Sequence, residues 1–283
     1  MSSSVFVSRN GVMIPAAEAS VSIFNPAIYG SYGVYESLQV VNGVVFEQEA
    51  HLQRLAHSAQ IVELPLPADL MTIGTWISRV VAAQECPNCT VRLFVVGPDN
   101  GGEPAAFVWT QPPPVFPPSY YTEGVTAITF EARRFLPGAK SLNMLASFMA
   151  QRRAREAGVH EALLHHDGCL TEGSNSNLFA VINDVVLTAP DHEVLAGVTR
   201  DVLMALARGA GIHVREMLLP LDEIVGWDEC FITSTNRHVM PVTRIEGRPV
   251  GDGKVGPLTR RLRELFEANF EAQAGAGVKF IAS

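Results

Sequence analysis

The sequence lacks several patterns that would place it in particular protein classes. Basic residues number 21 against 29 acidic ones, which gives a formal net charge of −8, and no block of Lys and Arg could follow a nucleic-acid backbone. No stretch of about 18 apolar residues predicts a membrane-spanning helix. The start, MSSSVFVSRNG, has neither a charged region before an apolar core nor a small-residue cleavage site, so we expect no signal peptide. These absences favour a cytoplasmic protein whose partners are neither nucleic acids nor membranes.

Cysteine is also rare, and its spacing argues against two kinds of site. The chain has Cys86, Cys89, Cys169 and Cys230, of which the first two form a lone C-x-x-C motif. A structural zinc site needs a second such pair or spaced histidines, which the other two cysteines do not supply. A thioredoxin-like motif stands at the start of a helix, whereas here a Pro-Asn pair leads into the strand-like run VRLFVV. We interpret Cys86 and Cys89 as surface-turn cysteines and expect no metal site.

Apolar residues are plentiful. They make up 47% of the 283 residues against 18% charged residues, which suits a well-packed globular enzyme of one large or two modest domains. The first 110 residues have an α+β pattern. Asn42-Gly43 between two apolar runs predicts a hairpin. Leu52 and Leu55 share one face of a predicted helix, and residues 91–96 and 105–111 are expected strands.

Five prolines stand among residues 112–118, where they remove backbone donors and fix φ. Neither a helix nor a central strand should continue through this stretch. We therefore expect a domain of residues 1–111, a stiff connector of residues 112–124 and a second domain of residues 125–283. In the second domain, strand-like runs alternate with helical ones and end in an amphipathic helix of residues 256–270.

Lysine is the scarcest charged residue, with Lys140, Lys254 and Lys279 alone among the 21 basic residues. Lys254 stands in a turn sequence and Lys279 near the C-terminus, so both are expected in solvent. Lys140 lies between Pro137-Gly138 and an apolar helix, where its side chain is expected to point inward. A buried lysine loses its charge readily and can act as a nucleophile. On location alone, however, a lysine that extends from the helix start into solvent is the more common arrangement.

Four further polar features stand at turns or element ends. Glu172 precedes a Gly-Ser-Asn turn, and Gly197–Arg200 opens a helix whose amides and Thr199 could hold a phosphate. Thr235 follows a predicted strand, and Arg54 stands on the first long helix. Each has an ordinary alternative: a turn carboxylate, an N-cap threonine, a strand threonine and an exposed helix arginine.

Taken together, their order and spacing resemble the class IV (fold type IV) aminotransferases, the group of the branched-chain and D-amino-acid aminotransferases and of aminodeoxychorismate lyase. The matching stretches are HLQRLAHSA (51–59), AKSLN (139–143), HEALLHHDGCLTEGSNSNLFAV (160–181), LAGVTRDVL (195–203), ECFITSTNRHVMPVTRIEG (229–247) and DGKVGP (252–257). The resemblance spans nearly the whole chain. It implies an α+β fold of two domains: a small α+β N-terminal domain and a larger C-terminal domain with a barrel-like sheet.

The resemblance also implies pyridoxal 5′-phosphate as the cofactor. Lys140 takes the place of the lysine that forms the internal aldimine and carries the proton between the substrate Cα and the cofactor C4′ in a 1,3-proton shift. Glu172 takes the place of the carboxylate that pairs with the pyridine nitrogen. The phosphate-binding positions correspond to Arg54, Val198, Thr199 and Thr235, and Asn177 matches the asparagine that closes the glutamate loop.

The sequence is less decisive about the substrate. D-amino-acid aminotransferases carry an Arg-x-His carboxylate trap where this chain has VVGPDNGGEPAA (95–106), without arginine or histidine. The run VRLFVVG resembles a branched-chain enzyme strand and makes Arg92 a candidate pocket residue, with pairing to a surface acid as its alternative. The residues after Lys140, Ser141–Met144, are instead closer to the D-amino-acid and lyase branches.

Three tyrosines complete the candidate pocket. Tyr29, Tyr32 and Tyr35 fall where family members place pocket aromatics, although tyrosines at a strand start are also ordinary core residues. We expect transamination from a hydrophobic donor, with an L-branched-chain amino acid favoured, to a 2-oxo acid such as 2-oxoglutarate. A D-amino-acid or (R)-amine transaminase and an aminodeoxychorismate lyase are the alternatives. The resemblance further implies a homodimer.

Overall fold

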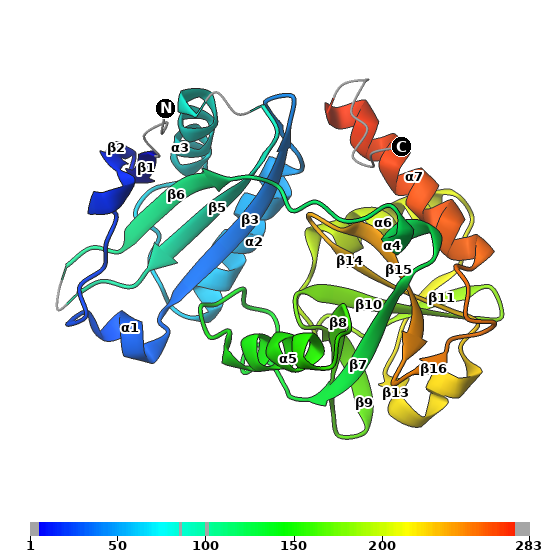
Figure 1. Ribbon diagram of the computed structural model, residues 1–283. Coiled ribbons are helices and arrows are strands. Elements are labelled where there is room, and N and C mark those ends of the chain that lie inside the picture. Colours follow the sequence, from blue (N-terminus) through cyan, green and yellow to red (C-terminus); the bar gives the residue numbers. More distant parts are fainter. Residues whose placement is uncertain (1–5, 85–86, 100–101, 275–283) are drawn as a thin grey trace. The chain divides into compact units, whose positions relative to one another are not determined.

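The computed structural model describes residues 6–84, 87–99 and 102–274, which form two compact units (Figure 1). Both units combine helices with a sheet, so the α+β class is confirmed. Unit 1 takes the chain as far as Pro114, the segment Ala139–Asn143, and Gln273 with Ala274, whereas unit 2 takes Val115–Gly138 and Met144–Ala272.

Unit 1 is built on a six-stranded antiparallel sheet. Its strands are β1 (Phe6–Arg9), β2 (Val12–Pro15), β3 (Gly33–Val41), β4 (Val44–Val45), β5 (Cys89–Val96) and β6 (Ala105–Gln111), in the spatial order β2-β1-β6-β5-β3-β4. Its helices are the 3-10 helix η1 (Ala16–Glu18), α1 (Pro26–Gly30), α2 (Gln48–Ile61) and α3 (Leu70–Ala83). Asn42 and Gly43 have positive φ angles of 51° and 77°, which confirms the hairpin that this dipeptide predicts between β3 and β4.

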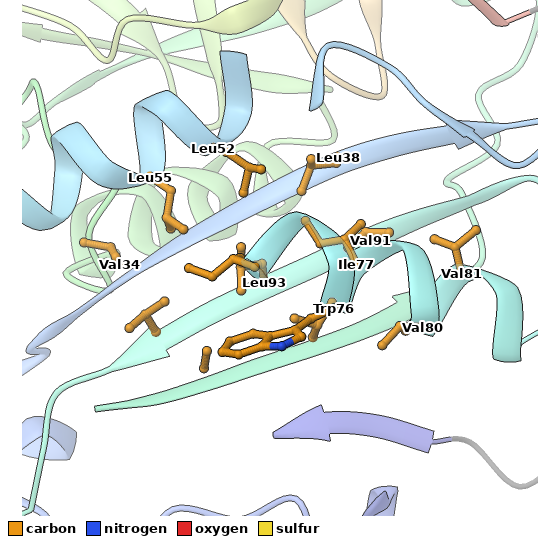
Figure 2. Packing of buried hydrophobic residues seen from close by; sticks show 14 of the residues in the cluster. Val34, Leu38, Leu52, Leu55, Trp76, Ile77, Val80, Val81, Val91 and Leu93 are labelled. Carbon is orange, nitrogen blue, oxygen red and sulfur yellow. The ribbon is translucent and has the colours of Figure 1, made fainter. Parts of the chain in front are cut away.

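The core of unit 1 lies between the sheet and helices α2 and α3 (Figure 2). Leu52 and Leu55 of α2 are buried, as their shared helical face predicts. Ile73, Ile77 and Val80 of α3 are fully buried, and their spacing of four and three residues places them on one side of the helix. This packing holds α2 against β3, the two elements that carry most of the unit 1 residues described below.

The segment that contains Lys140 runs beside β3 within unit 1. The Tyr35 amide donates to the Lys140 carbonyl at 2.9 Å, and the Leu142 amide donates to the Gly33 carbonyl at 2.9 Å. The sequence pattern predicts one continuous second domain, residues 125–283, which this segment interrupts. The interruption arises because these residues pair with a strand more than 100 positions earlier in the chain, a long-range pairing that local pattern does not reveal.

Unit 2 contains the larger sheet. Its strands are β7 (Val125–Glu131), β8 (Glu161–His166), β9 (Cys169–Gly173), β10 (Ser176–Ile182), β11 (Val185–Thr188), β12 (Val214–Glu216), β13 (Leu219–Pro220), β14 (Glu229–Ser234), β15 (His238–Ile245) and β16 (Arg248–Pro249). Its helices are α4 (Ser119–Thr122), α5 (Leu145–Glu156), α6 (Val198–Gly209), the 3-10 helix η2 (Leu221–Gly226) and α7 (Pro257–Ala274).

Part of this sheet closes on itself. Strands β10, β14, β15, β7, β8 and β9 follow one another as hydrogen-bonded neighbours, and β9 pairs again with β10 through Glu172↔Asn177 and Gly173↔Ser176. The six strands therefore form the barrel-like sheet that the resemblance implied. Leu163, Leu178 and Ile232, all fully buried, belong to its core.

Two local expectations need correction. Residues 119–122 of the proline-rich stretch form the short helix α4, because Pro118 leaves its own carbonyl free to accept from the Thr122 amide at 3.2 Å. Cys89 is not a surface residue: it opens β5, is fully buried and packs in the core of unit 1.

Cys86 and Lys279 lie outside the described residues. Lys254 is 81% exposed, as its turn sequence predicts.

Unit 2 also carries a buried histidine with consequences for pH dependence. The His160 ring contacts the ring of Tyr120 at 4.7 Å between centroids, and its Nε2 has no hydrogen-bond partner among the described residues. Burial and, secondarily, the charge of Arg237 lower the pKa of His160 to about 4, against the opposing charge of Glu161. The folded protein thus keeps this ring neutral over a range in which an unfolded chain protonates it.

We expect the free energy of unfolding to fall as the pH falls from about 6.5 towards 4, because the unfolded state binds a proton that the folded state does not. At pH 5, His160 should account for about 1–2 kcal/mol of this loss. Urea unfolding of the parent and of His160→Gln at pH 8 and pH 5 measures this loss. At pH 8, the difference in unfolding free energy between the two proteins contains the packing cost alone. An equal fall in stability from pH 8 to pH 5 in the variant and the parent would contradict the prediction.

Candidate active site

Lys140 contacts Tyr35 within unit 1. Its Nζ lies 4.4 Å from the centroid of the Tyr35 ring, and its amide donates to the Ser58 hydroxyl at 3.0 Å. Tyr35 is 5% exposed and Ser58 is fully buried. Lys140 is therefore half-buried beside an aromatic ring. Its location in the sequence alone favours the other arrangement, in which the side chain extends into solvent.

A buried ion cluster lies next to it. The Glu36 carboxylate on β3 accepts from Arg54 Nε and Nη2, both at 2.8 Å, and lies 2.8 Å from His51 Nδ1. Burial acts to raise the pKa of Glu36, but the charge and hydrogen bonds of Arg54, with those of His51, hold it well below its usual range. Burial lowers the pKa of His51, against the hydrogen bond and charge of Glu36; the charges of Arg54 and Lys140 lower it further. Arg54 is thus a fixed, ion-paired cation and not an exposed helix arginine.

Arg92 also contacts the Tyr35 ring. Its guanidinium carbon is 5.6 Å from the ring centroids of both Tyr35 and Phe94, and burial lowers the pKa of the guanidinium. No carboxylate or carbonyl of the described chain accepts a hydrogen bond from it, so the alternative of a surface ion pair is wrong. Arg92 and Lys140 both face the Tyr35 ring, and five guanidinium donors remain for a ligand.

The other two tyrosines do not join this group. The Tyr32 hydroxyl donates to the Glu63 carbonyl at 2.8 Å, which turns it towards the end of α2. Tyr29 lies on α1 and is 81% exposed. Of the three tyrosines expected in the pocket, unit 1 itself brings only Tyr35 to Lys140 and Arg92.

Glu172 lies at the end of β9 in unit 2 and is buried. Its Oε1 accepts from Arg134 Nε at 2.8 Å, and its Oε2 accepts from the Leu195 amide at 3.3 Å. These two donors fix the direction of the carboxylate and leave lone pairs for another donor. An N–H group of a ligand is the kind of partner that such a carboxylate holds.

Asn177 connects the neighbouring strands to the start of α6. On β10 it lies opposite Glu172 on one side and Thr233 on the other, and its Nδ2 donates to the Leu195 carbonyl at 2.8 Å. A Cβ added to Gly197 would lie 1.9 Å from Asn177 Oδ1, so only glycine allows this close approach. Asn177 therefore sets where the loop enters the helix.

The first turn of α6 has the character of an anion site. Gly197, and not Thr199, is the N-cap of α6. A glycine has no side chain to cap the helix, and the close approach of Asn177 requires a glycine at this position. Val198 and Thr199 follow within the first turn, where backbone amides lack intrahelical acceptors. The hydroxyl of Thr233 is buried without a partner among the described residues, two positions before Thr235. Thr235 itself lies in the turn between β14 and β15. These groups suit a phosphate.

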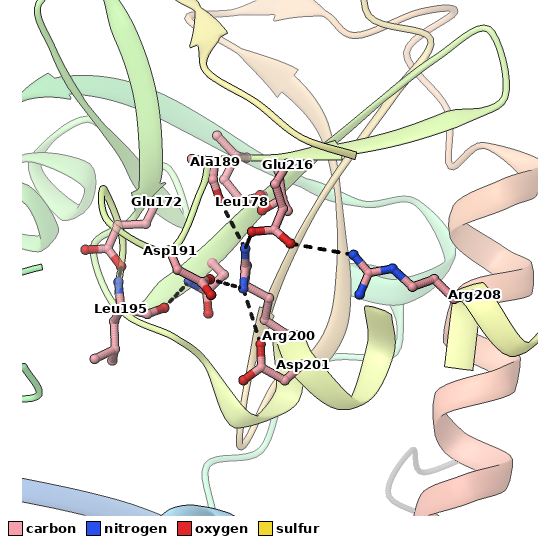
Figure 3. A network of polar contacts seen from close by, with 11 residues as sticks. Glu172, Leu178, Ala189, Asp191, Leu195, Arg200, Asp201, Arg208 and Glu216 are labelled. Carbon is pink, nitrogen blue, oxygen red and sulfur yellow. Dashed lines mark hydrogen bonds and ion pairs between the residues drawn. The ribbon is translucent and has the colours of Figure 1, made fainter. Parts of the chain in front are cut away.

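Arg200 anchors that first turn (Figure 3). It is 1% exposed and donates to Asp191 at 2.6 Å, Asp201 at 3.2 Å and Glu216 at 3.3 Å, as well as to the Ala189 carbonyl at 3.1 Å. Figure 3 also shows the Leu195 amide bonded to Glu172. The arginine of the GVTR motif thus has a structural role, holding the loop before α6 in place.

We expect Gly197→Ala to weaken phosphate-ester binding by about tenfold and to lower stability, because the added methyl group displaces Asn177 or the helix start at a cost of about 1–3 kcal/mol. Gly209→Ala, at the other end of α6, is the matched control: its Cβ meets nothing within 4 Å, and it should be neutral or stabilising by up to about 1 kcal/mol. Calorimetry with pyridoxal 5′-phosphate and thermal unfolding measure both effects. Equal behaviour of the two variants would refute the packing argument.

Several polar residues of this region were not found from the sequence. Glu36 could have been suspected, since a carboxylate inside an apolar strand run is unusual. Arg134 gave no such signal, because two consecutive arginines before a loop are common on surfaces.

Among the described residues, no group of His, Cys, Asp and Glu is arranged to hold a metal ion. Likewise, no helix in the described part of the chain is long and apolar enough to cross a membrane.

Comparisons of the sequence and the structure with known proteins agree on one family. The sequence model of the family described as "Amino-transferase class IV" matches residues 33–245. A putative branched-chain-amino-acid aminotransferase of Methanocaldococcus jannaschii is 34% identical over 273 residues, covering 91% of this chain and 94% of that one. A D-alanine aminotransferase of Bacillus licheniformis is 32% identical over 268 residues, covering 91% and 94%.

Among solved structures, the branched-chain amino acid aminotransferase of T.th. with pyridoxamine 5′-phosphate is similar in fold, with a TM-score of 0.88. It is 27% identical in sequence, and the match covers 98% of this chain and 97% of that chain. Because the match covers 98% of this chain, it includes both units.

Proposed function

The chain belongs to the class IV aminotransferases and is a pyridoxal-phosphate-dependent transaminase, and on this premise we propose that it transfers the amino group of a hydrophobic, branched-chain L-amino acid to 2-oxoglutarate. The observation that carries the proposal is the pair of cations facing the Tyr35 ring: Lys140 at 4.4 Å and Arg92 at 5.6 Å from its centroid. A reactive amine beside a guanidinium that has no hydrogen-bond acceptor among the described residues suits an oxo acid with a second carboxylate a few bonds from its reacting carbon.

Each unit, taken by itself, carries residues that suit the cofactor. When bound, pyridoxal phosphate supplies an aldehyde that condenses with amines and a protonated ring that accepts the electrons released at the substrate Cα. Lys140 would hold the cofactor through its amine and, once the substrate amine has replaced it, would act as the base that takes the proton from the Cα. Glu172 would keep the proton on the ring nitrogen. The first turn of α6, with Val198 and Thr199, and the Thr235 turn hold the phosphate, and Asn177 keeps the α6 loop in place. Arg54 adds positive charge.

Arg92 is proposed to bind the side-chain carboxylate of 2-oxoglutarate. Charged hydrogen bonds of this kind contribute about 1.5–3 kcal/mol, so Arg92→Gln should raise the KM for 2-oxoglutarate by about 10–100-fold. The KM for pyruvate, which lacks the second carboxylate, should change much less. Arg79→Gln, on the exposed side of α3, is the matched control and should leave both values unchanged. An equal rise for both oxo acids would assign Arg92 to the shared carboxylate instead.

The donor is tested by measuring oxo-acid or ketone product from L-Leu, L-Val, D-Ala and (R)-1-phenylethylamine with 2-oxoglutarate. We expect turnover of L-Leu and L-Val. The second candidate function is a D-amino-acid transaminase, favoured by the Ser141-Leu142-Asn143 sequence after Lys140 and by the similarity to D-alanine aminotransferases. Activity with D-Ala and none with L-Leu would establish that alternative and refute the proposed donor.

We also propose that the protein is a homodimer. Ile23, Phe24 and Tyr29, close together in the sequence of unit 1, are each about 80% exposed in the single chain, an unusual cluster of large apolar side chains. A second copy that covers them would remove this surface from water. Light scattering coupled to gel filtration gives the mass: twice that of the chain supports the dimer, and the single-chain mass of 30.6 kDa contradicts it.

A further inference from the structure

The buried carboxylate of Glu161, at the start of β8, collects five hydrogen bonds. It accepts from the Ala162 amide at 2.9 Å, the Ser174 amide at 3.3 Å, the Ser176 hydroxyl at 3.0 Å and Arg237 Nη1 at 2.6 Å, and also from the Ser174 hydroxyl. Glu161 is 1% exposed. Burial of a charged carboxylate is costly unless its lone pairs are filled, and here every donor except Ala162 comes from another element.

Four of these donor groups lie in or at the edge of two turns. Ser174 lies in the turn between β9 and β10 and Ser176 opens β10, two and four residues after Glu172. Arg237 lies in the turn between β14 and β15, which also contains Thr235. One carboxylate therefore connects the β9–β10 turn, which follows the strand end that carries Glu172, with the β14–β15 turn that contains Thr235. Both connections are contacts within unit 2.

The first of these turns is shaped around Glu161. A Cβ at Gly173 would lie 2.1 Å from the Ser176 hydroxyl and 3.2 Å from Glu161 Oε2. The missing side chain lets Ser176 and the carboxylate approach each other next to Glu172. On the second turn, Arg237 is only 16% exposed, so its charge depends on Glu161 for compensation.

We propose that Glu161 is a positioning residue that fixes the spacing between Glu172 and the Thr235 turn, and so sets how tightly the chain holds pyridoxal 5′-phosphate. The inference depends on the proposed roles of Glu172 at the ring nitrogen and Thr235 at the phosphate. The ring nitrogen and the phosphate of the cofactor are joined by a rigid ring and a short methylene–oxygen link, so their binding groups must keep a nearly constant separation. Loss of the shared carboxylate releases both turns at once.

The test compares Glu161→Gln with Glu229→Gln. Glu229 is a second buried carboxylate of unit 2; it accepts from the Leu258 and Thr259 amides and caps α7. Both substitutions should lower the melting temperature of the cofactor-free protein. Glu161→Gln alone should raise the dissociation constant for pyridoxal 5′-phosphate, by about 10–100-fold, the range that corresponds to charged hydrogen bonds. Visible absorbance during titration of cofactor-free protein measures it without turnover.

Arg237→Gln removes one of the two connections with less disturbance of the interior, and should weaken cofactor binding by about tenfold. It serves as the second variant if Glu161→Gln does not fold. Unchanged affinity in Glu161→Gln or Arg237→Gln, or an equal loss in Glu229→Gln, would overturn the positioning role. Unchanged cofactor affinity in both Glu172→Gln and Thr235→Val would instead contradict the underlying roles of those two residues.

Discussion

Lys140→Ala is expected to abolish transamination, with a loss of at least about 10⁴-fold in kcat, and to remove the visible absorbance of lysine-bound cofactor. Lys140 supplies the amine that attaches to the aldehyde and the base that moves the Cα proton, and no other lysine is described near Tyr35. The cofactor should still bind through the groups of unit 2, with lower affinity. Absorbance spectra and single-turnover assays with the proposed donor measure the two effects.

Lys254→Ala is the matched control, because Lys254 is 81% exposed and pairs only loosely with Asp252 at 3.9 Å. It should retain the parent spectrum and rate. Addition of methylamine to Lys140→Ala should restore part of the rate, since a small amine can act as the missing base. A Lys140→Ala protein that transaminates at near the parent rate would refute the assignment.

Glu172→Gln is expected to lower kcat by about 10²–10³-fold while most of the protein still binds the cofactor. A neutral amide cannot keep the proton on the ring nitrogen as firmly as a carboxylate, so the ring accepts electrons from the Cα less readily. The substitution also removes the ion pair with Arg134, whose Nε lies 2.8 Å from the carboxylate. Steady-state rates at saturating cofactor separate the effect on the reaction from the effect on binding.

Glu193→Gln provides a control of the same chemistry in the same unit. Glu193 pairs with Arg133 at 3.6 Å and with His166 at 3.0 Å, next to the arginine that pairs with Glu172. Its replacement also breaks an ion pair, but should change kcat by less than about twofold, since such partly exposed pairs contribute little. If the two variants lost activity equally, the special role of Glu172 would be untenable.

The sequence predicted those parts of the fold that local pattern encodes. The turn at Asn42-Gly43 shows the positive φ angles that these residue types favour. Helix α3 was not foreseen, although its apolar residues repeat at helical spacing. The assignment of residues 139–143 to unit 1 could not be foreseen, because it depends on pairing with β3.

The residues of the candidate site also divide into those that the local sequence marks and those that acquire a role only through a distant partner. Lys140 and Glu172 are marked by a scarce residue type and a turn motif, and the order of these features in the chain, which resembles the family, selects them over their ordinary alternatives. The roles of Glu36, Arg134 and Glu161 could not be chosen in this way, since each depends on a partner distant in the sequence: Arg54 for Glu36, Glu172 for Arg134 and Arg237 for Glu161. A single carboxylate or guanidinium acquires meaning only through the group that the fold brings to it.

The central claim, that Lys140 carries the cofactor, is tested most directly by borohydride reduction of the cofactor-loaded protein followed by peptide mass mapping. Reduction makes the bond between cofactor and lysine permanent. We predict that the added mass appears on the peptide that contains Lys140 and is absent after Lys140→Ala. Labelling of Lys254 or Lys279 in its place, or a protein left unlabelled although cofactor is bound, would contradict the account.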